Sequence, residues 1–574
     1  MKILGKSQIL LYLPAFAASA VLLTVIQAPI GLWPLAWVAY VPLILVSSPA
    51  AKPRALFAAG YVVSLFYWLG NLYWMAPVTL PGWIAFCLYT ALLLPTAAIA
   101  LRRCRIWRVP LVLAVPILVV GAERLQGLFL GGFFWRHLAH SQYANITLIQ
   151  IADIFGASGV SFLVAMVNAL AAELIIARSE KNLLKIRHTA AIVVVCAAMV
   201  GAFLYGRWRI AQSDNFAEAG PLVGSVQSNI PQSVKTGGES SNVIFADLMN
   251  RSRAAAAAGA ELIVWPETMV QAILNRDIWP FLVSTRENRA FDKAISEHAE
   301  ETAYLLVGAY GGKIKQGPDL KGYLARYNSA FLYGPDGGQR PRSYNKIHLV
   351  PFGEVVPFKK SAPWLYNILM KFTPYEHDYS LDYGSEYTVF EMTGGKAASE
   401  KIYRFGTMIC YEDAIPSIAR NFALDKEGQK RLDWLINISN DGWFVRFNGE
   451  KVHPSTELAE HTAICVFRAV ENRLGILRSV NTGVSCLIDP TGRIQDGFVA
   501  GNLPKQAMKR QGMAGWFIAQ MPIDKRITFF TKYGQWLDFS CAVCFVSVII
   551  GLLSAGYVRR RKNASVSRVQ PNES

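Results

Sequence analysis

The feature that most constrains this chain is a set of long, mostly uncharged stretches. A transmembrane helix needs about 20 mostly apolar residues. Seven such stretches precede residue 207 and one lies near the C-terminus, with none comparable at 207–538. They cover residues 8–27, 31–48, 55–75, 81–101, 109–127, 159–177, 189–206 and 539–556. The pattern predicts a polytopic α-helical membrane protein with about eight transmembrane helices around a globular part.

The composition fits a membrane protein and excludes other classes. Apolar residues make up 53% of the chain and charged residues 17%, against about 25% charged residues in a soluble domain. So much apolar material excludes an intrinsically disordered chain. The 8 cysteines among 574 residues are too few for a disulfide scaffold.

The basic residues predict the orientation. Clusters precede the first stretch and follow the second, fourth, sixth and eighth, so all fall on one side if all eight stretches span. These are Lys2, Lys6, Lys52, Arg54, Arg102, Arg103, Arg105, Arg108, Arg178, Lys181, Lys185, Arg187, Arg559, Arg560, Arg561 and Lys562. The positive-inside rule then places both termini in the cytoplasm of a bacterium and residues 207–538 in the periplasm, at the inner membrane. Arg124 and Arg136, after the fifth stretch, are the exceptions.

The same residues account for much of the net charge of +17. We expect no nucleic-acid partner, because no basic helix with interleaved aromatic residues occurs. The first apolar run continues through residues 21–26, beyond the small residues that could form a cleavage site. We therefore expect an uncleaved first span rather than a signal peptide.

Residues 216–512 have the pattern of a mixed α/β domain. Short β-branched runs, such as 262–265 and 434–438, alternate with helical patterns, such as 289–302 and 456–472. Such alternation favours a layered α/β sandwich. The expected organisation is therefore seven spans in 1–206, the domain at 216–512, a connector at 513–538, the eighth span at 539–556 and a cytoplasmic tail at 557–574.

Three expected strand ends carry residues that could do chemistry: Glu267, Lys346 and Cys410. Taken singly, each has an ordinary explanation, as a helix-start carboxylate, a surface lysine or a buried cysteine. Together they would converge at one rim of a sheet. A cysteine nucleophile needs a base and an oxyanion stabiliser, roles that Glu267 and Lys346 could fill. A lysine in this apolar setting needs a carboxylate partner, which could be Glu354 or Glu267.

Other chemistry has little support. No phosphate-binding glycine loop occurs, and no pair of cysteines stands with histidines at metal-binding spacing, so we expect neither cofactor nor metal. The outer domain holds three cysteines, Cys410, Cys465 and Cys486. Because three is odd, at least one is unpaired within the chain; Cys465 and Cys486 either form a disulfide or lie in the core.

The contexts of these residues resemble a known family. Trp-Pro-Glu267, Lys346-(x)4-Pro-Phe-Gly-Glu354 and Cys410-Tyr-Glu resemble the Glu-Lys-Cys triad of the nitrilase (carbon–nitrogen hydrolase) superfamily. Spans on both sides of such a domain narrow the resemblance to the apolipoprotein N-acyltransferase family. Further similar stretches are residues 123–125, 132–135, 226–232, 440–444, 468–473 and 478–483.

The resemblance implies a periplasmic αββα sandwich and a two-step, ping-pong reaction without a cofactor. Cys410 would take an acyl chain from a membrane phospholipid, typically phosphatidylethanolamine, as a thioester. The α-amine of a diacylglyceryl-cysteine on an apolipoprotein would then accept the chain. Glu267 would be the general base, Lys346 the oxyanion stabiliser and Glu354 the group that orients Lys346. Tyr411 and Glu412 would shape the pocket, and the Tyr411 backbone N–H is an oxyanion donor candidate.

Four positions depart from the family pattern: Ser228, Thr236, Val445 and Glu460. All three triad positions match the family, so these departures bear on the substrate contacts more than on the catalytic chemistry. Two segments, 278–283 and 364–370, are more apolar than surface loops should be. They are either core or interfacial lids that gate lipid entry, through Trp279, Trp364 and Leu365.

Two other functions stay open. A membrane-tethered amidase for a small amide would use the same triad with water as the acceptor, although one span would be enough for a tether. A transporter with an accessory outer domain usually needs ionisable residues at mid-membrane, and candidates here are few, such as Glu173.

Overall fold

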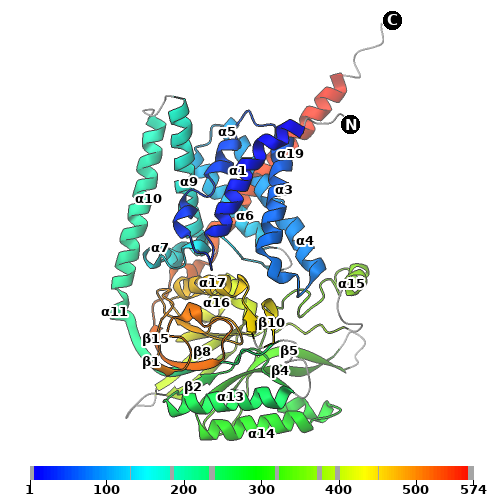
Figure 1. Cartoon of the computed structure of the whole chain (residues 1–574), viewed down its shortest axis with the longest axis vertical. Helices are drawn as coiled ribbons and strands as arrows, with labels where there is room; N and C mark the ends of the chain where they lie inside the picture. Colours follow the sequence, from blue (N-terminus) through cyan, green and yellow to red (C-terminus); the bar gives the residue numbers. More distant parts are fainter. Residues whose placement is uncertain are drawn as a thin grey trace.

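The computed structural model describes residues 6–128, 131–180, 186–231, 240–316, 322–371, 378–394, 401–449 and 451–566. Lys2, Lys181, Lys185 and Thr236 therefore lie outside the described residues. A bundle of helices stands on an α/β domain, and both ends of the chain lie at the end of the bundle away from that domain (Figure 1).

The bundle packs around a central helix, α6. This helix contacts α5, α9 and α19, and a Cβ at Gly121 would lie 2.7 Å from the Cys541 carbonyl oxygen. Close approach at a small residue is a common way for membrane helices to associate. The bundle helices are α1 (Lys6–Val25), α2 (Val41–Val46), α3 (Pro53–Asn71), α4 (Leu80–Thr90), α5 (Leu93–Ile106), α6 (Leu111–Gln126), α9 (Ala157–Ser179), α10 (Ile186–Ala211) and α19 (Trp536–Val566).

Within the described residues, four stretches are helical, long and apolar enough to cross a membrane by length and composition: Leu80–Ile106, Ala157–Ser179, Ile186–Ala211 and Trp536–Tyr557. The expectation of one continuous helix at 31–48 is wrong. A 3-10 turn, η1 (Trp33–Trp37), and the short α2 divide this segment, and each has a proline in its first turn. Because proline lacks an N–H, it is well placed at a helix start and breaks a helix interior.

The broken segment nevertheless runs from one end of the bundle to the other. At one end, Gln142 donates to the Trp33 carbonyl oxygen, in the layer beside the α/β domain. At the other end, Arg102 donates to the Ala51 carbonyl oxygen at 2.7 Å. The α10 and α19 helices also extend past the expected ends, to Ala211 and Val566.

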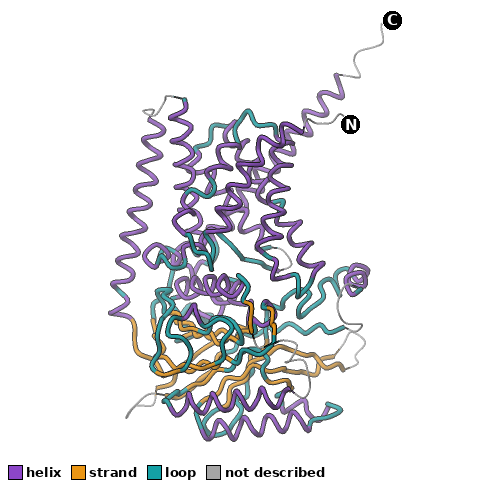
Figure 2. The backbone as a smooth tube through the Cα atoms, in the orientation of Figure 1, coloured by secondary structure: helices purple, strands orange, loops and turns teal. Residues whose placement is uncertain are grey.

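The α/β domain has four layers. Helices α13 (Ser240–Ala257) and α14 (Arg286–Glu301) cover the outer face of one sheet, and α16 (Pro416–Ala423) and α17 (Glu457–Asn472) cover the other, on the side of the bundle (Figures 1 and 2). The inner faces meet where the Ser479 hydroxyl donates to the Val264 carbonyl oxygen at 2.9 Å. The fold is thus the αββα sandwich expected from the resemblance.

Parallel pairing of central strands brings their carboxyl ends to one rim. The first sheet has the order β14-β15-β1-β2-β4-β5-β6, with β3 beside β4, and the second β13-β12-β9-β8-β7. The strands are β1 (Ala217–Gln227), β2 (Leu262–Val264), β3 (Val270–Ile273), β4 (Tyr304–Gln316), β5 (Gly322–Tyr333), β6 (Tyr344–Asn345), β7 (Val389–Gly394), β8 (Lys401–Ile409), β9 (Trp434–Ser439), β12 (Gly475–Val480), β13 (Cys486–Ile488), β14 (Ala500–Gly501) and β15 (Gly515–Asp524), with a separate hairpin of β10 (Arg446–Asn448) and β11 (Lys451–His453).

The expected connector at 513–538 contains a strand of the domain, β15 (Gly515–Asp524). β15 pairs antiparallel with β1 along its length, from Ala217 opposite Asp524 to Gln227 opposite Gly515. The first and last strands of the domain are therefore neighbours, and each continues toward a bundle helix. Between β15 and α19 lies only α18 (Phe529–Tyr533) with short loops.

A buried ion cluster joins the domain to the bundle. Asp153 in α8 (Ala152–Phe155) accepts from Arg473 at 2.7 Å and from Arg209 in α10 at 2.7 Å. Arg473 is fully buried and also donates to Gln150 at 2.7 Å. A buried guanidinium depends on this carboxylate for charge balance.

We expect Asp153→Asn to destabilise the protein by about 3–5 kcal/mol, because it leaves buried charge without its partner. The measurement is the thermal unfolding of the full chain in detergent, compared with Asp277→Asn at an exposed aspartate. Equal melting temperatures for the two variants would contradict the role of this cluster.

Candidate active site

The cysteine lies where a strand ends in a tight turn. Cys410 follows the last residue of β8 and begins the 3-10 turn η6 (Cys410–Ala414), with a φ of 55°. This left-handed conformation is uncommon for a residue with a side chain and often marks a functional site. The Asn437 side chain holds the turn by donating to the Cys410 carbonyl oxygen at 3.0 Å.

The lysine is buried between two carboxylates. Lys346, just after β6, is 1% exposed; its Nζ lies 3.2 Å from Glu267 Oε1 and 2.8 Å from Glu354 Oε2. Burial alone would lower the pKa of Lys346, but the two carboxylates outweigh it and hold the pKa well above its usual value. The lysine is therefore a fixed positive charge beside the cysteine.

Asn328, which sequence reasoning missed, bridges the two carboxylates. From β5, its side-chain nitrogen donates to Glu267 Oε1 at 2.6 Å and to Glu354 Oε1 at 2.8 Å. The Asn440 backbone N–H donates to Glu267 Oε2 at 2.8 Å. No sequence motif marks Asn328, because its strand also contains the polar residues Arg326 and Ser329.

The cysteine thiol is protonated at neutral pH. Burial raises the pKa of Cys410, and the nearby charge of Glu267 raises it further. Lys346 and a hydrogen bond with the Ser439 hydroxyl lower the Cys410 pKa, but the net shift is well above the usual range. Because the thiolate is the nucleophile, the site needs a base, and Glu267 is the carboxylate whose charge acts most strongly on Cys410.

Glu412 ties the nucleophile turn to the lysine loop. Its carboxylate accepts the backbone N–H groups of Ile409 at 2.7 Å and Ile347 at 2.7 Å, and the Tyr344 hydroxyl at 2.8 Å. Burial raises the pKa of Glu412 to about 7. These contacts fix the position of Lys346 relative to Cys410.

Tyr411 ties the same turn to the bundle. Its hydroxyl donates to the Gly132 carbonyl oxygen at 2.8 Å, and its ring stacks on Trp135 and Phe133. Gly132, Phe133 and Trp135 belong to the loop after α6, so bundle and domain build this part of the site together.

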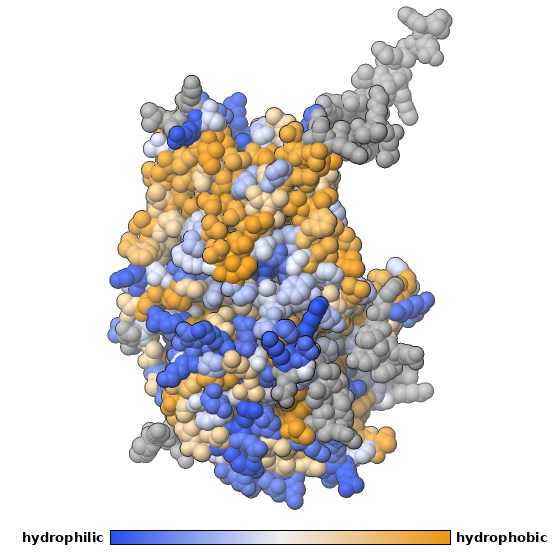
Figure 3. All heavy atoms as spheres, viewed as in Figure 1, coloured by the Kyte–Doolittle hydropathy of each residue, from blue (hydrophilic) through white to orange (hydrophobic). Residues whose placement is uncertain are grey.

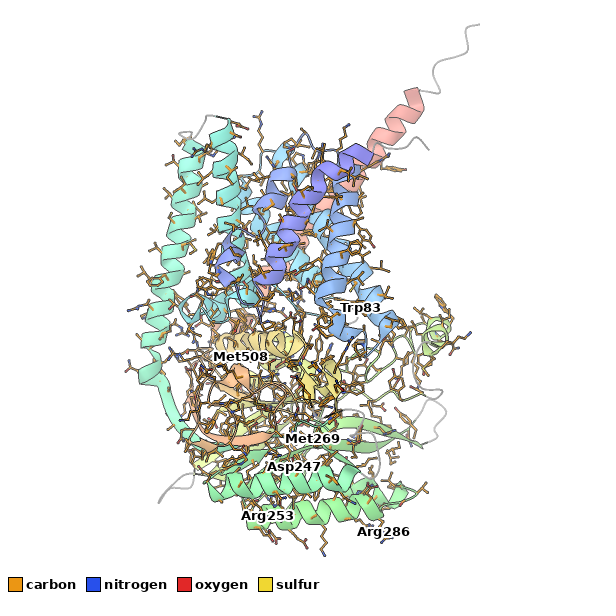
Figure 4. All side chains as sticks on the ribbon, viewed as in Figure 1. Trp83, Asp247, Arg253, Met269, Arg286 and Met508 are labelled. Atoms are coloured by element: carbon orange, nitrogen blue, oxygen red, sulfur yellow. The ribbon has the colours of Figure 1, made fainter. Side chains whose placement is uncertain are left out.

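Two cavities meet at Cys410. A polar one of about 270 Å³ is lined by Glu267, Lys346 and Glu354. A smaller, apolar one of about 80 Å³ is lined mainly by aromatic rings of the bundle and the domain. Figure 4 places Trp83 at the end of α4 that faces the domain, and Met269, two residues after Glu267, among the strands below. The apolar cavity is lined by Trp74, Met75, Val78, Thr79, Gly82, Phe86, Gly132, Phe133, Trp135, Val350, Pro351, Phe352, Cys410, Tyr411, Phe444, Glu457 and His461.

A second ionised cluster borders the apolar cavity. His461 Nδ1 lies 3.1 Å from Glu457 Oε1 and 3.7 Å from Asp441 Oδ1, while His461 Nε2 lies 2.6 Å from Asp413. Among the described residues, Asp441, Glu457 and His461 form the one group with metal-ligand spacing, with donor atoms within 4.8 Å. The Arg478 guanidinium, 3.7 Å from Asp441 Oδ2, already supplies positive charge there.

The proposed access residues lie in two different places. Trp364 is 67% exposed on α15 (Pro363–Met370), which stands out to the side where domain and bundle adjoin (Figure 1), and Leu365 is half-buried. Trp279 is only 8% exposed; it donates to the Ile273 carbonyl oxygen and packs under Arg289 of α14, the layer farthest from the bundle. Trp279 is therefore a packing residue, and the access hypothesis is wrong for it.

The structure describes the surroundings of three positions that depart from the family pattern. Glu460 pairs with Arg136 and accepts from the Trp135 indole at 2.6 Å, which accounts for a basic residue on this side of the bundle. Val445 is buried directly after the turn η7 (Asp441–Phe444). Ser228 is buried, and its hydroxyl has no partner within the described residues.

Cys465 and Cys486 are buried and free. Of the two alternatives, the structure has core residues rather than a disulfide.

Comparison with known proteins shows which family this chain belongs to. Residues 19–170 match the family model of the apolipoprotein N-acyltransferase N-terminal domain, and residues 222–502 match that of the carbon–nitrogen hydrolases. An apolipoprotein N-acyltransferase of Geobacter metallireducens is 32% identical, covering 84% of this chain and 86% of the relative. The chain belongs to the apolipoprotein N-acyltransferase family.

Other relatives match over most of their length. An apolipoprotein N-acyltransferase of Chlorobaculum tepidum is 26% identical, covering 93% of both chains. Among solved structures, a variant of the Nesterenkonia AN1 amidase of the nitrilase superfamily is 14% identical, with a TM-score of 0.34, covering 56% of this chain and 93% of that one. The family match and four long apolar helices within the described residues indicate a membrane protein.

The charges around Cys410 predict opposite effects of two substitutions. Glu267→Gln removes a negative charge that raises the thiol pKa, so alkylation of Cys410 should begin at lower pH. Lys346→Met removes a positive charge that lowers this pKa, so alkylation should begin at higher pH. The measurement is the rate of iodoacetamide labelling of the Cys410 peptide against pH, by mass spectrometry.

The control is Glu218→Gln, at a carboxylate paired with Lys401 and Lys525 on the surface. It should leave the labelling profile unchanged. A shift in the same direction for both site variants would show that the charges do not act as described.

Proposed function

We propose that this chain transfers an acyl chain from a phospholipid to the α-amine of the diacylglyceryl-cysteine of apolipoproteins, the last step of bacterial lipoprotein maturation. One observation carries the proposal: Cys410, Glu267 and Lys346 meet where a polar and an apolar cavity join, directly below a bundle of apolar helices. Membership in the family supports the same reaction.

In the first half-reaction Glu267 accepts the Cys410 thiol proton as the sulfur attacks the ester carbonyl of the phospholipid. Lys346 stabilises the oxyanion, with the Tyr411 backbone N–H as a second donor. The carbon–oxygen bond then breaks, Glu267 returns the proton to the leaving oxygen, and a lysophospholipid departs. A thioester on Cys410 remains, as covalent catalysis requires.

In the second half-reaction the neutral amine of the acceptor attacks the thioester carbonyl. The carbon–sulfur bond breaks, and a proton from the nitrogen passes through Glu267 to the sulfur. Glu354 and Asn328 hold Lys346 and Glu267 in place through both steps. Because the donor product leaves before the acceptor reacts, the kinetics should be ping-pong.

The cavities suit lipid substrates. Both include Val78, Val350 and Phe444 beside Cys410, an apolar wall for the transferred acyl chain. The polar cavity, with Arg326 among its lining residues, suits the glycerophosphate part of the donor. We assign phosphatidylethanolamine as the donor from the family resemblance.

We also propose eight crossings of the bacterial inner membrane, with both termini in the cytoplasm and the α/β domain in the periplasm. The bundle surface in Figure 3 is mainly hydrophobic, whereas that of the domain is mainly hydrophilic. Arg102 and Ala51 meet at the end away from the domain, in keeping with the positive-inside rule. The second crossing is the broken segment of η1 and α2.

The family match supports this function over the two alternatives. An amidase acting on a small soluble amide has no need of bundle residues in its cavity, and a transporter has no need of a Glu-Lys-Cys site outside the membrane.

Incubation of the full chain with labelled phosphatidylethanolamine should leave one acyl group on Cys410, seen by intact and peptide mass spectrometry. Cys410→Ser should carry no thioester, and Glu267→Gln should form it at least about 100-fold more slowly, since a general base contributes about that much. A wild-type protein that takes no acyl group from any phospholipid, but hydrolyses a small amide, would contradict the proposal.

We keep α15 as an interfacial lid in this proposal, because its apolar residues Trp364 and Ile368 are exposed. Replacing Trp364 and Leu365 by serine should slow acyl-enzyme formation at least about tenfold in bilayers, given about 1.5–3 kcal/mol for each large apolar side chain withdrawn from water. A short-chain lipid in detergent should react normally.

The control for the lid is Phe281→Ser with Val283→Ser. These exposed apolar residues lie at the end of a 3-10 turn and in the loop that leads into α14. Unchanged acylation of the lid variant in bilayers would exclude a lid.

A further inference from the structure

The proton balance of the second half-reaction leaves one proton without an acceptor. An α-ammonium group has a pKa of about 7.7–8.0, so much of the acceptor is protonated at neutral pH. Its nitrogen must lose one proton to attack and a second when the amide forms. Glu267 can pass one of these to the Cys410 sulfur as the carbon–sulfur bond breaks, and the other needs a second base.

A second carboxylate borders the apolar cavity beside Cys410. Glu457, at the start of α17, lines this cavity together with His461. It is 1% exposed, and its Oε2 has no hydrogen-bond partner within the part of the chain that the structure describes. An unsatisfied buried carboxylate oxygen costs free energy, which a bound cation or proton recovers.

The groups around Glu457 are charged. Its Oε1 lies 3.1 Å from His461 Nδ1, and His461 Nε2 lies 2.6 Å from Asp413, which Arg478 holds at 2.5 Å. Asp441, 3.7 Å from His461, also faces this group. Burial lowers the pKa of His461, but Asp413 outweighs burial and holds this pKa well above its usual value. Three carboxylates thus face one guanidinium and one imidazolium, so a proton or a cation on Glu457 completes the charge balance.

The remaining walls of the cavity favour a cation as well. Trp74, Trp135 and Phe444 line it, and aromatic faces attract ammonium groups, more strongly where water is excluded.

We propose that Glu457 binds the primary ammonium of the acceptor in the apolar cavity and removes its first proton. This inference rests on the proposed function. The proton moves from nitrogen to Glu457 Oε2 before the nitrogen lone pair attacks the thioester. Glu457 releases this proton to water after the amide product leaves, and no other bond changes in this step.

The acidity of Glu457 is compatible with this role. Burial, and then the charge of Asp441, raise its pKa to about 8. A base whose pKa lies close to that of the acid it deprotonates can both take the proton and release it.

The test separates the two half-reactions in the full-length protein. The acyl-enzyme is formed first, and its reaction with a synthetic diacylglyceryl-cysteine peptide is then followed by mass spectrometry. In Glu457→Gln we expect transfer at pH 7 to slow at least tenfold while acylation changes less than about threefold. The deficit should shrink at pH 9, where more amine is neutral, and hydroxylamine, neutral at pH 7, should cleave both thioesters equally.

Two further variants test whether Glu457→Gln slows transfer only because it disturbs the fold. Glu457→Asp keeps the carboxylate and should recover part of the transfer rate, and Glu301→Gln, at an exposed glutamate on α14, should match the wild type. Melting temperatures of all variants are compared.

Three results would overturn the inference. Transfer at the wild-type rate in Glu457→Gln would exclude the base. Slower acylation from phosphatidylethanolamine but not from phosphatidylglycerol would assign the site to the donor ammonium instead. Equal slowing of both half-reactions at every pH would show that Glu457 has only a structural role. A wild-type protein that forms no acyl-enzyme would contradict the proposed function instead, which distinguishes the two failures.

Discussion

The structure of the site depends on one buried ammonium group between two carboxylates. Lys346 is 1% exposed, and a charge at such a place is stable only with opposite charge in contact. Glu267 comes from the end of β2, Glu354 from the turn beyond β6, and Asn328 from β5 holds both. The sheet rim that brings these elements together therefore sets the charge balance around Cys410.

The second constraint is that the site must lie against the bundle. Loops of the bundle supply Trp74, Phe133 and Trp135 to the apolar cavity, and Trp135 is bonded to Glu460 of α17. Pairing of β1 with β15 brings both links to the bundle to one place. An isolated α/β domain would lack one wall of its own site, which explains why the chain is tied to the bundle at both ends.

The sequence predicted residues whose chemistry depends on local context, and missed those defined by contacts across the fold. Motifs pointed to Glu267, Lys346, Glu354 and Cys410, which the structure brings together, whereas the contacts of Asn328 depend on a strand neighbour that no local pattern marks. The sequence predicts a connector where β15 lies, because the strand that pairs with β15 is about 300 residues earlier in the chain. The break at 31–48 follows from local sterics at two prolines, which hydropathy does not register.

The two carboxylates near Cys410 differ in how their oxygens are satisfied, and this difference suits them to different tasks. Glu267 accepts from Asn328 and Asn440 and faces Lys346, so its position is fixed for exchanging a proton with the neighbouring sulfur. Glu457 borders the apolar cavity, and its Oε2 has no hydrogen-bond partner within the described residues, so this oxygen can take a proton or bind an arriving ammonium. Glu267, whose oxygens are hydrogen-bonded, lines the polar cavity, and Glu457, whose Oε2 has no partner within the described residues, lines the apolar cavity. With a separate base in each cavity, the two proton transfers of the second half-reaction do not compete for one carboxylate.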